Sequence, residues 1–194
     1  MITWWFDRIA PWYDRFAEPM MLSHAERAYS LLELTGQERI LDLAGGTGLL
    51  ARLIAERTRA HVTVLDASEG MLAQLPRHPR IVSVHSPAHS LPFPKETFDW
   101  VVCGAAFHWL TPHAVTLAAV RRVLKPSGRL FLHDFDRHGL LGPLLERGEA
   151  LMHWGAAYLS QPELAALLTE QGFEGRFFPF NLVQYGFIGS KAPL

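Results

Sequence analysis

Short apolar runs alternate with polar, helix-like stretches through the middle of the chain. The runs are rich in valine, isoleucine and leucine and do not alternate strictly with polar residues, a pattern typical of strands buried on both faces of a parallel sheet. They are Ile40–Leu43, Val62–Leu65, Ile81–Val84, Trp100–Cys103 and Leu130–Leu132. Because helical stretches separate them, the pattern predicts a doubly wound α/β fold.

Capping and stop signals predict where the helices begin and end. Serine and threonine can accept from free backbone N–H groups at a helix start, and glycine favours helix ends. Starts are predicted at Ser68 with a helix running toward Leu75, at Thr111 with Pro112 in the first helical position, and at two capping boxes, Ser23–Glu26 and Ser160–Glu163, with helix ends at Gly36 and Gly172.

The two ends of the chain depart from this alternation. Residues 1–36 predict helices that precede the first strand. Near the other end, Phe173–Phe178 and Leu182–Ile188 are apolar runs joined by a short turn, which indicates a closing antiparallel hairpin. No internal repeat or interdomain linker is visible, so we expect one domain over residues 1–194.

Composition narrows the class of protein. The apolar fraction of 49% is ordinary for a globular protein, and a net charge of −1 gives no electrostatic signal for nucleic-acid binding. The single Cys103 excludes an internal disulfide and fits a reducing compartment. With neither a long uncharged apolar run nor a signal-peptide pattern, we expect a cytoplasmic protein without stable membrane insertion. The oligomeric state stays open.

The segment Ile40–Gly48 carries the clearest candidate chemistry. A strand ends, a glycine-rich turn follows, and a helix is predicted to start near Leu49. Glycines let a ligand approach the backbone, and a helix N-terminus offers free N–H groups. The next strand ends at Asp66, where a carboxylate can accept both hydroxyls of an adenosine ribose.

Two cofactor classes fit this pattern. Gly46–Ala51 also satisfies the dinucleotide pattern G-x-G-x-x-G/A. Asp42 argues against a dinucleotide, since a carboxylate about 4 Å from a pyrophosphate costs several kcal/mol at an effective dielectric near 20. S-adenosylmethionine has no phosphate and carries an ammonium and a sulfonium, which Asp42 would attract.

Five segments resemble class I S-adenosylmethionine-dependent methyltransferases, most closely the type found in ubiquinone and menaquinone biosynthesis. They are the glycine motif Leu41–Gly48, the acidic loop Leu65–Leu72, the stretches Leu91–Asp99 and Arg122–Leu130 that lead into the fourth and fifth strands, and the N-terminal cap Phe6–Asp14. The resemblance covers nearly the whole chain. It implies a seven-stranded, mostly parallel Rossmann-like sheet, with a helical cap over 1–36, a cofactor-binding core over 37–136, and substrate-side helices and the closing hairpin over 137–194.

The resemblance also implies roles for the matching positions. Asp42 and the turn would face the methionine part of the cofactor, Asp66 would hold the ribose, and the residues just past the fourth strand would lie beneath the sulfonium. The implied cofactor-binding residues are Tyr13, Asp42, Ala44, Gly45, Gly46, Gly48, Asp66, Ala67, Met71, Ala88, His89 and Ala105.

One position departs from the family pattern. Pro87 stands where the family usually has the aspartate that accepts from the adenine amino group. The Ala88 N–H can still donate to the adenine, but the amino group loses an acceptor, a bond of about 0.5–1.5 kcal/mol. We expect weaker cofactor binding unless His89 or a carbonyl substitutes.

Two histidines are candidates for a general base, which methyl transfer needs only when the acceptor must lose a proton. His108 follows the fourth strand and His133 ends the fifth, and such folds bind ligands at the carboxyl ends of strands. Either histidine could instead satisfy a local hydrogen bond. The run His133–His138 is rich in possible metal ligands, but Cys103-Gly-Ala-Ala offers no carboxylate to share an ion, so no metal is expected.

The acceptor pocket must be formed by the N-terminal cap and residues 137–159, because the chain has no room for a substrate domain. The second segment is apolar, through Leu140, Leu141, Leu144, Leu145, Leu151, Met152 and Trp154. This favours a small, partly apolar acceptor such as a quinone, lipid or aromatic metabolite. The aromatic group of Trp4, Trp5, Trp12 and Phe16 fits a lid, a membrane-surface anchor or simple packing, although neighbouring charges are mixed.

Three alternatives to a small-molecule methyltransferase remain at this stage. The fold could bind the cofactor or its demethylated product without catalysis, or the Gly46–Ala51 pattern could belong to a nicotinamide-dependent oxidoreductase. A protein or nucleic-acid methyltransferase is disfavoured, since the sequence shows neither a basic surface nor an Asn-Pro-Pro-Tyr-type segment after the fourth strand.

Overall fold

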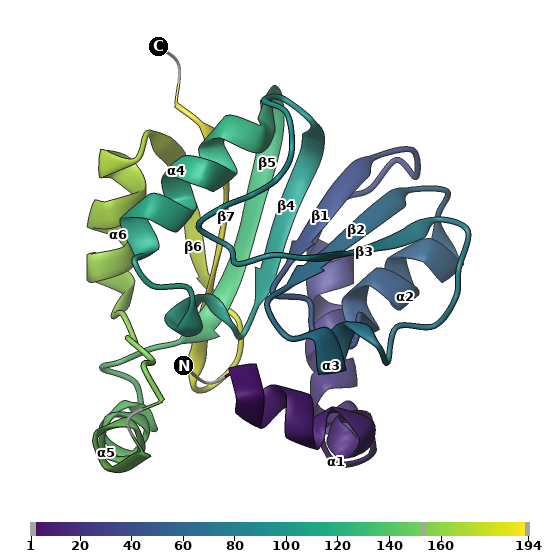
Figure 1. The fold of residues 1–194 in the computed structure, drawn as a ribbon. Coiled ribbons are helices and arrows are strands. Elements are labelled where there is room, and N and C mark those ends of the chain that lie inside the picture. Colours follow the sequence, from purple (N-terminus) through teal and green to yellow (C-terminus); the bar gives the residue numbers. More distant parts are fainter. Residues whose placement is uncertain (1–2, 153, 193–194) are drawn as a thin grey trace.

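Seven strands form a single twisted sheet in the computed structural model, which describes residues 3–152 and 154–192, without the side chains of 16–20 and 152 (Figure 1). The order is β3-β2-β1-β4-β5-β7-β6. The first five strands are parallel, and β7 runs antiparallel to both β5 and β6. The strands are β1 (Arg39–Leu43), β2 (His61–Asp66), β3 (Ile81–His85), β4 (Phe98–Gly104), β5 (Leu124–Phe135), β6 (Phe173–Pro179) and β7 (Gln184–Lys191).

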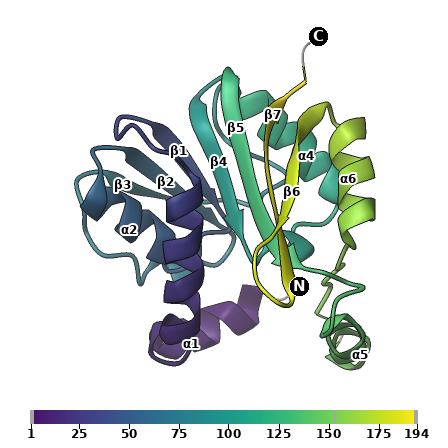
Figure 2. The ribbon, with the colours of Figure 1, turned by 180° about the vertical axis from the view of Figure 1, so that it is seen from behind.

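Helices cover both faces of the sheet and one of its ends (Figures 1 and 2). They are α1 (Thr3–Leu31), α2 (Leu49–Arg57), α3 (Glu69–Leu72), the 3-10 turn η1 (Phe107–Trp109), α4 (His113–Val123), α5 (Gly142–Met152) and α6 (Gln161–Glu170). The first part of α1 crosses beneath the carboxyl ends of the parallel strands, and its later part runs up one face of the sheet (Figure 2). Among the residues described, no helix combines the length and apolarity needed to span a bilayer.

Successive residues of the central strands enter different cores, which explains why these runs are apolar throughout. Leu41 and Leu43 pack in a core with α4 and α6, whereas Ile40, which precedes Leu41, packs with α1 and α2. The same alternation divides Val101 from Val102 in β4. Since side chains of a strand alternate between faces, a strand covered on both sides needs no polar positions.

The structure confirms the predicted doubly wound, mostly parallel sheet and its antiparallel hairpin. Each of the five apolar runs lies within a strand, and β5 is longer than its run because it begins at Leu124. The predicted capping box at Ser160–Glu163 is present, with both reciprocal hydrogen bonds. Ser68 caps α3 through the Met71 N–H, but this helix ends at Leu72 instead of near Leu75.

Two predicted helix starts are wrong. Ser23–Glu26 lies inside α1, where the helix continues and the N–H groups need no side-chain cap. At α4, the N-cap is Pro112 and not Thr111, because Pro112 has extended backbone angles and its carbonyl already accepts from the Thr116 N–H.

Gly48, which precedes α2, has a backbone that only glycine adopts readily. Its φ is +75°, and a Cβ built there would lie 2.1 Å from Leu75 Cδ2. We predict that Gly48→Ala lowers the free energy of unfolding by about 1–3 kcal/mol, through the left-handed backbone and the displaced leucine. Urea denaturation measures this. Gly148→Ala in α5, where a Cβ meets nothing within 4 Å, should not destabilise the protein.

Candidate active site

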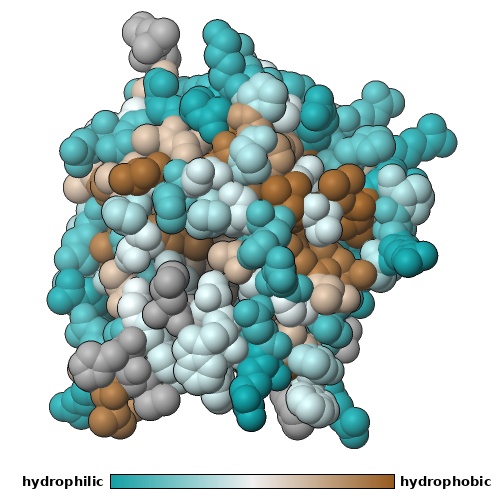
Figure 3. Space-filling model, in the orientation of Figure 1, coloured by the Kyte–Doolittle hydropathy of each residue, from teal (hydrophilic) through white to brown (hydrophobic). Residues whose placement is uncertain are grey.

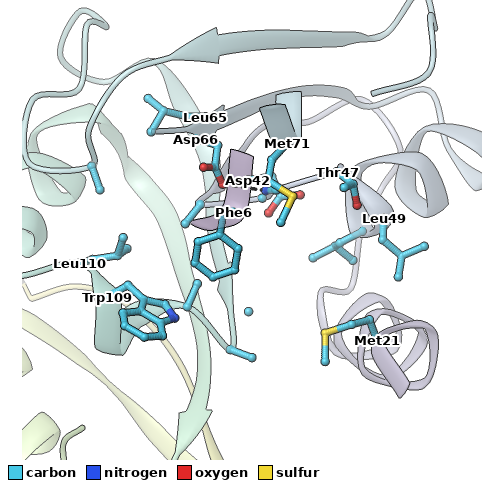
Figure 4. Close-up of a pocket in the computed structure, with 18 of the residues that line it drawn as sticks. Phe6, Met21, Asp42, Thr47, Leu49, Leu65, Asp66, Met71, Trp109 and Leu110 are labelled. Carbon is cyan, nitrogen blue, oxygen red and sulfur yellow. Dashed lines mark hydrogen bonds between the residues drawn. The ribbon is translucent and has the colours of Figure 1, made fainter. Parts of the chain in front are cut away.

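A cavity of about 420 Å3 lies where the strand order reverses between β1 and β4. Ligands in open α/β sheets bind outside the carboxyl ends of the strands at this point. Its walls come from the turn after β1, the ends of β2, β4 and β5, and the inner face of α1. Figure 4 shows Asp42, Asp66 and Met71 around the upper part of the cavity and Trp109 and Leu110 on another wall.

Asp66 ties the glycine turn to the end of β2. Its Oδ2 accepts from the Gly46 N–H at 2.9 Å, and its Oδ1 accepts from the Ser68 N–H at 2.9 Å. Burial raises the pKa of this carboxyl, and the backbone N–H groups oppose the rise. Gly46, with φ +56°, has open space where a Cβ would stand. A ligand can therefore lie directly over this backbone.

Asp42 is a buried carboxylate with an unsatisfied oxygen. The Ala51 N–H donates to this side chain, but Oδ2 has no hydrogen-bonding partner within the described chain. Burial, followed by the nearby negative charge of Asp66, raises the pKa of Asp42 to about 7. An unpartnered buried carboxylate at the cavity wall costs stability unless a ligand compensates it. A cationic group would do so.

Two alanines at the cavity have left-handed backbones. Ala44 follows β1 with φ 55°, and Ala105 follows β4 with φ 49°. Such angles cost an L-residue on the order of 1 kcal/mol and cluster at ligand sites. Here they turn the chain sharply away from two neighbouring strands and leave space above the sheet.

The first turns of α1 close the cavity from the side opposite the sheet. Phe6 and Tyr13 line it, and the Phe6 ring meets the Trp109 ring edge to face at 6.2 Å between centroids (Figure 4). Asp7 Oδ1 accepts from Ser68 Oγ at 2.6 Å and from the Gly70 N–H at 2.9 Å. Asp14 Oδ1 accepts from Thr47 Oγ1 at 2.6 Å. Two carboxylates thus fasten this helix to the loops that shape the cavity.

His108 and Asp134 form a buried dyad at the cavity. His108 Nδ1 lies 2.7 Å from Asp134 Oδ1, and the His108 backbone N–H donates to Asp134 Oδ2 at 2.7 Å. A carboxylate only accepts, so Nδ1 carries the proton and Nε2 is left as an acceptor. The ring also stacks on Tyr158 at 4.6 Å between centroids. The imidazole is therefore fixed in orientation and tautomer.

His133 has a different environment, although it lines the same cavity. Its ring stacks face to face on Phe180 at 3.9 Å, and burial lowers its pKa to about 3. Its Nδ1 has no partner among the described residues. This imidazole is neutral at physiological pH and is a weak base.

Most residues expected to bind the cofactor, and both candidate bases, gather at this cavity. They are Tyr13, Asp42, Ala44, Gly45, Gly46, Asp66, Ala67, Met71, Ala88, Ala105, His108 and His133. Two do not reach it. Gly48 packs against Leu75 behind the turn, and His89 is exposed outside the cavity.

The expected contribution of residues 137–159 to the acceptor pocket stays a prediction. None of the described side chains in this range lines the cavity, although Tyr158 stacks on His108 and Trp154 lies near Trp109. Leu140 and Leu144 are 83% and 66% exposed, because α5 lies away from the sheet (Figure 1). Of the residues expected to build a pocket or lid, the side chains of Phe16 and Met152 lie outside the described part of the structure.

Several residues of the site were not identified from the sequence. Asp134, which binds His108 from behind the cavity wall, stands beside His133 in an acidic run, and nothing in that run indicates which carboxylate turns toward His108. Phe6, Ser86, Trp109 and Phe135 line the cavity itself. For Phe6 the signal was present, since it lies in the N-terminal segment that resembles the family cap.

Comparison with known proteins defines the class. A family model described as a methyltransferase domain matches residues 41–132, which contain the turn after β1 and the end of β4. The chain belongs to the S-adenosylmethionine-dependent methyltransferases of the ubiquinone and menaquinone biosynthesis type. Because the chain belongs to this family, the alternative interpretation as a nicotinamide-dependent oxidoreductase is rejected.

Three similar proteins illustrate the range of the family. The chain is 34% identical, over 86% of its length and 79% of the relative, to a ubiquinone/menaquinone biosynthesis C-methyltransferase of Syntrophotalea carbinolica. It is 38% identical, over 93% of its length and 73% of the relative, to a malonyl-[acyl-carrier protein] O-methyltransferase of Geobacter sulfurreducens. A solved S-adenosylmethionine-dependent methyltransferase of Thermotoga maritima shares the fold, with a TM-score of 0.79, 22% identity and coverage of 96% and 97% of the two chains.

Proposed function

We propose that this enzyme transfers the methyl group of S-adenosylmethionine to a small, partly apolar acceptor, with His108 as the base. The observation that carries the proposal is the His108–Asp134 dyad, held across the cavity from a glycine turn and an unsatisfied carboxylate. The donor's sulfonium supplies an electrophilic methyl group. The chain must bind both reactants, exclude water and remove a proton.

The cavity residues fit the cofactor in charge and shape. The unpartnered Oδ2 of Asp42 suits the cationic end of the ligand, and the open space over Gly46 suits a backbone contact. Asp66, at the end of β2, would take the ribose hydroxyls. Ala67, Met71 and Ala88 offer apolar contact for the adenine, with Ser86 at the same wall where Pro87 removes the usual acceptor.

The reacting side of the cavity is aromatic. Phe6 and Trp109 form one wall, and Phe135 lies near His108 with centroids 6.0 Å apart. An apolar ring fits there by stacking and by burial of its surface. With Nδ1 engaged by Asp134, His108 Nε2 takes the proton that the acceptor loses as its nucleophilic atom bonds to the methyl carbon and the carbon–sulfur bond breaks. His133 is less suited, because its pKa of about 3 makes it a weak base.

The acceptor class is proposed from the aromatic wall and from relatives that methylate quinones. The test is transfer of a labelled methyl group to a panel of short-chain demethylquinols (the reduced form of the quinones), simple phenols and short acyl thioester carboxylates. We expect labelling of the quinols or phenols. Labelling of the thioester carboxylates alone would contradict the proposed acceptor.

Asp66→Ala should weaken binding of S-adenosylhomocysteine at least tenfold, because it removes both the ribose acceptor and the hydrogen bond that holds Gly46. Isothermal titration measures the loss. Asp99→Ala, at the opposite end of the sheet where Asp99 binds Lys125, is the control and should bind as the wild type does. Unchanged affinity in Asp66→Ala would refute the assignment of the ribose site.

A further inference from the structure

The outward face of the first part of α1 is unusual for a surface helix. Trp4 and Trp12 are 62% and 58% exposed, and Arg8 and Arg15 are exposed between and after them. These four positions are spaced by four, four and three residues, so they form one stripe along the helix. The opposite stripe contains Phe6 and Tyr13, which line the cavity.

The acidic and the basic side chains in the first part of α1 lie on different sides of the helix. In sequence, Asp7 and Asp14 stand next to Arg8 and Arg15 and make the segment look neutral. In the structure, Asp7 accepts from Ser68 and Gly70 beside α3, and Asp14 accepts from Thr47 and lies 3.7 Å from Arg52. Neither Arg8 nor Arg15 has an ion-pair partner in the described ranges. Between Trp4 and Arg15 the outward stripe is therefore aromatic and basic.

The segment that contains α5 repeats this arrangement. Leu144 and Arg147 are exposed three residues apart in α5, and Leu140 is exposed in the turn that precedes the helix. The acidic side chains of α5 are engaged elsewhere. Glu146 pairs with Arg137 at 2.5 Å, and Glu149 accepts from the Gly155 N–H.

These two faces belong to one end of the molecule. The first part of α1 and α5 both lie below the carboxyl ends of the parallel strands (Figures 1 and 2), and Trp5 of α1 stacks on Trp154 after α5 at 6.2 Å. The exposed brown surface at the lower left of Figure 3 lies over α5. We define the docking face as the outward stripe from Trp4 to Arg15 together with Leu140, Leu144 and Arg147.

We propose that the docking face binds the surface of a bilayer that contains anionic phospholipids. Tryptophan and leucine bury in the region between headgroups and acyl chains, and arginine pairs with lipid phosphates at the same depth. Charge complementarity favours an anionic surface, because the face has three arginines and its neighbouring carboxylates are engaged by the protein. The inner stripe of the same helix lines the active-site cavity, so docking places that cavity against the bilayer.

The proposal does not depend on the acceptor or on the role of His108. It concerns binding alone and is tested without cofactor or substrate. It requires no helix that crosses the membrane.

Vesicle co-sedimentation tests this proposal. The full chain is mixed with phosphatidylcholine vesicles and with vesicles of phosphatidylcholine and phosphatidylglycerol in equal parts. We expect at least tenfold stronger partitioning to the mixed vesicles, decreasing at high salt. Equal partitioning to both, or none to either, would overturn the proposal.

Matched variants test which surface binds. Arg8→Glu with Arg15→Glu should lower partitioning to mixed vesicles at least tenfold, since each basic residue contributes about fivefold. Trp12→Ser should lower it severalfold, with an unchanged thermal midpoint. Val82→Ser and Arg77→Glu, exposed positions near β3, are controls and should bind as the wild type does. The assignment would be refuted if the docking-face variants bound vesicles as tightly as the wild type does. It would also be refuted if the wild-type protein bound no vesicles and instead formed a dimer that Trp12→Ser dissociates.

Discussion

Replacing His108 by glutamine is expected to lower kcat for methyl transfer by about 10²–10⁴, the usual contribution of a positioned general base. The loss follows from the geometry, because Asp134 holds the Nδ1 proton and leaves Nε2 as an acceptor at the cavity. Glutamine can keep a hydrogen bond to Asp134 but cannot accept a proton. Binding of S-adenosylhomocysteine should remain within about threefold of the wild type, since the base is needed only for the transfer step.

Asp134→Asn tests the positioning half of the dyad. Asparagine removes the charge that stabilises a protonated His108 and permits the other imidazole tautomer, so kcat should fall by about 10–100-fold. Loss of the charge makes the His108 imidazole less basic, so the acidic limb of the kcat–pH profile should move to lower pH, whereas a merely structural change would leave the profile in place.

Two controls separate catalysis from folding. His61→Gln, an exposed histidine at the start of β2, should retain full activity. His133→Gln should lower kcat far less than His108→Gln, since burial already makes His133 a weak base. A His133 variant that loses activity while His108→Gln keeps it would reverse the proposed roles.

Asp42→Asn is expected to stabilise the ligand-free protein while weakening the cofactor complex at least tenfold. The buried carboxylate has an ordinary pKa of 3.8 when unfolded and a pKa of about 7 in the fold, a difference that corresponds to about 4 kcal/mol. The contribution of protonated Asp42 to the free energy of unfolding is complete below about pH 4 and is lost as the pH rises through about 7. Above pH 7 the folded protein therefore carries the whole cost of the buried charge, which asparagine avoids.

The sign of this effect is measurable. At pH 8 the ligand-free variant should unfold at a higher urea concentration than the wild type, by an amount equivalent to several kcal/mol at most, and the difference should shrink toward pH 5. Asp99→Asn is the matched control. Its carboxylate binds Lys125 and the Arg39 N–H, which lower its pKa, so this variant should lose stability at pH 8 and bind the cofactor normally. A destabilised Asp42→Asn protein at pH 8 would contradict the account of Asp42.

The sequence predicted the sheet well because each central strand is covered on both faces. Ile40, Leu41 and Leu43 had to be apolar wherever they pointed, and no neighbouring pattern competed with that signal. The glycine turn was equally clear, since Gly46 and Gly48 both have left-handed backbones. Local signals failed where the surroundings decide the outcome. Ser23–Glu26 has the residues of a capping box, but α1 had already begun at Thr3.

The sequence predicted those site residues whose positions follow from the strand that carries them, and it did not predict contacts between distant segments. Asp42 and Asp66 are fixed by their places at strand ends, whereas the partnership of His108 with Asp134 joins two chain segments and depends on which face of β5 Asp134 takes. Leu140 and Leu144 show the same limit of local signals. Both are apolar and close in sequence to the site, but α5 stands off the sheet and leaves them exposed.

The most direct test of the central claim is a crystal structure of the protein with S-adenosylhomocysteine. The account predicts the ribose hydroxyls at Asp66, the amino group of the ligand toward Asp42, and the sulfur facing the part of the cavity lined by Ala105 and His108. A ligand bound outside this cavity, or one whose sulfur points away from His108, would contradict it.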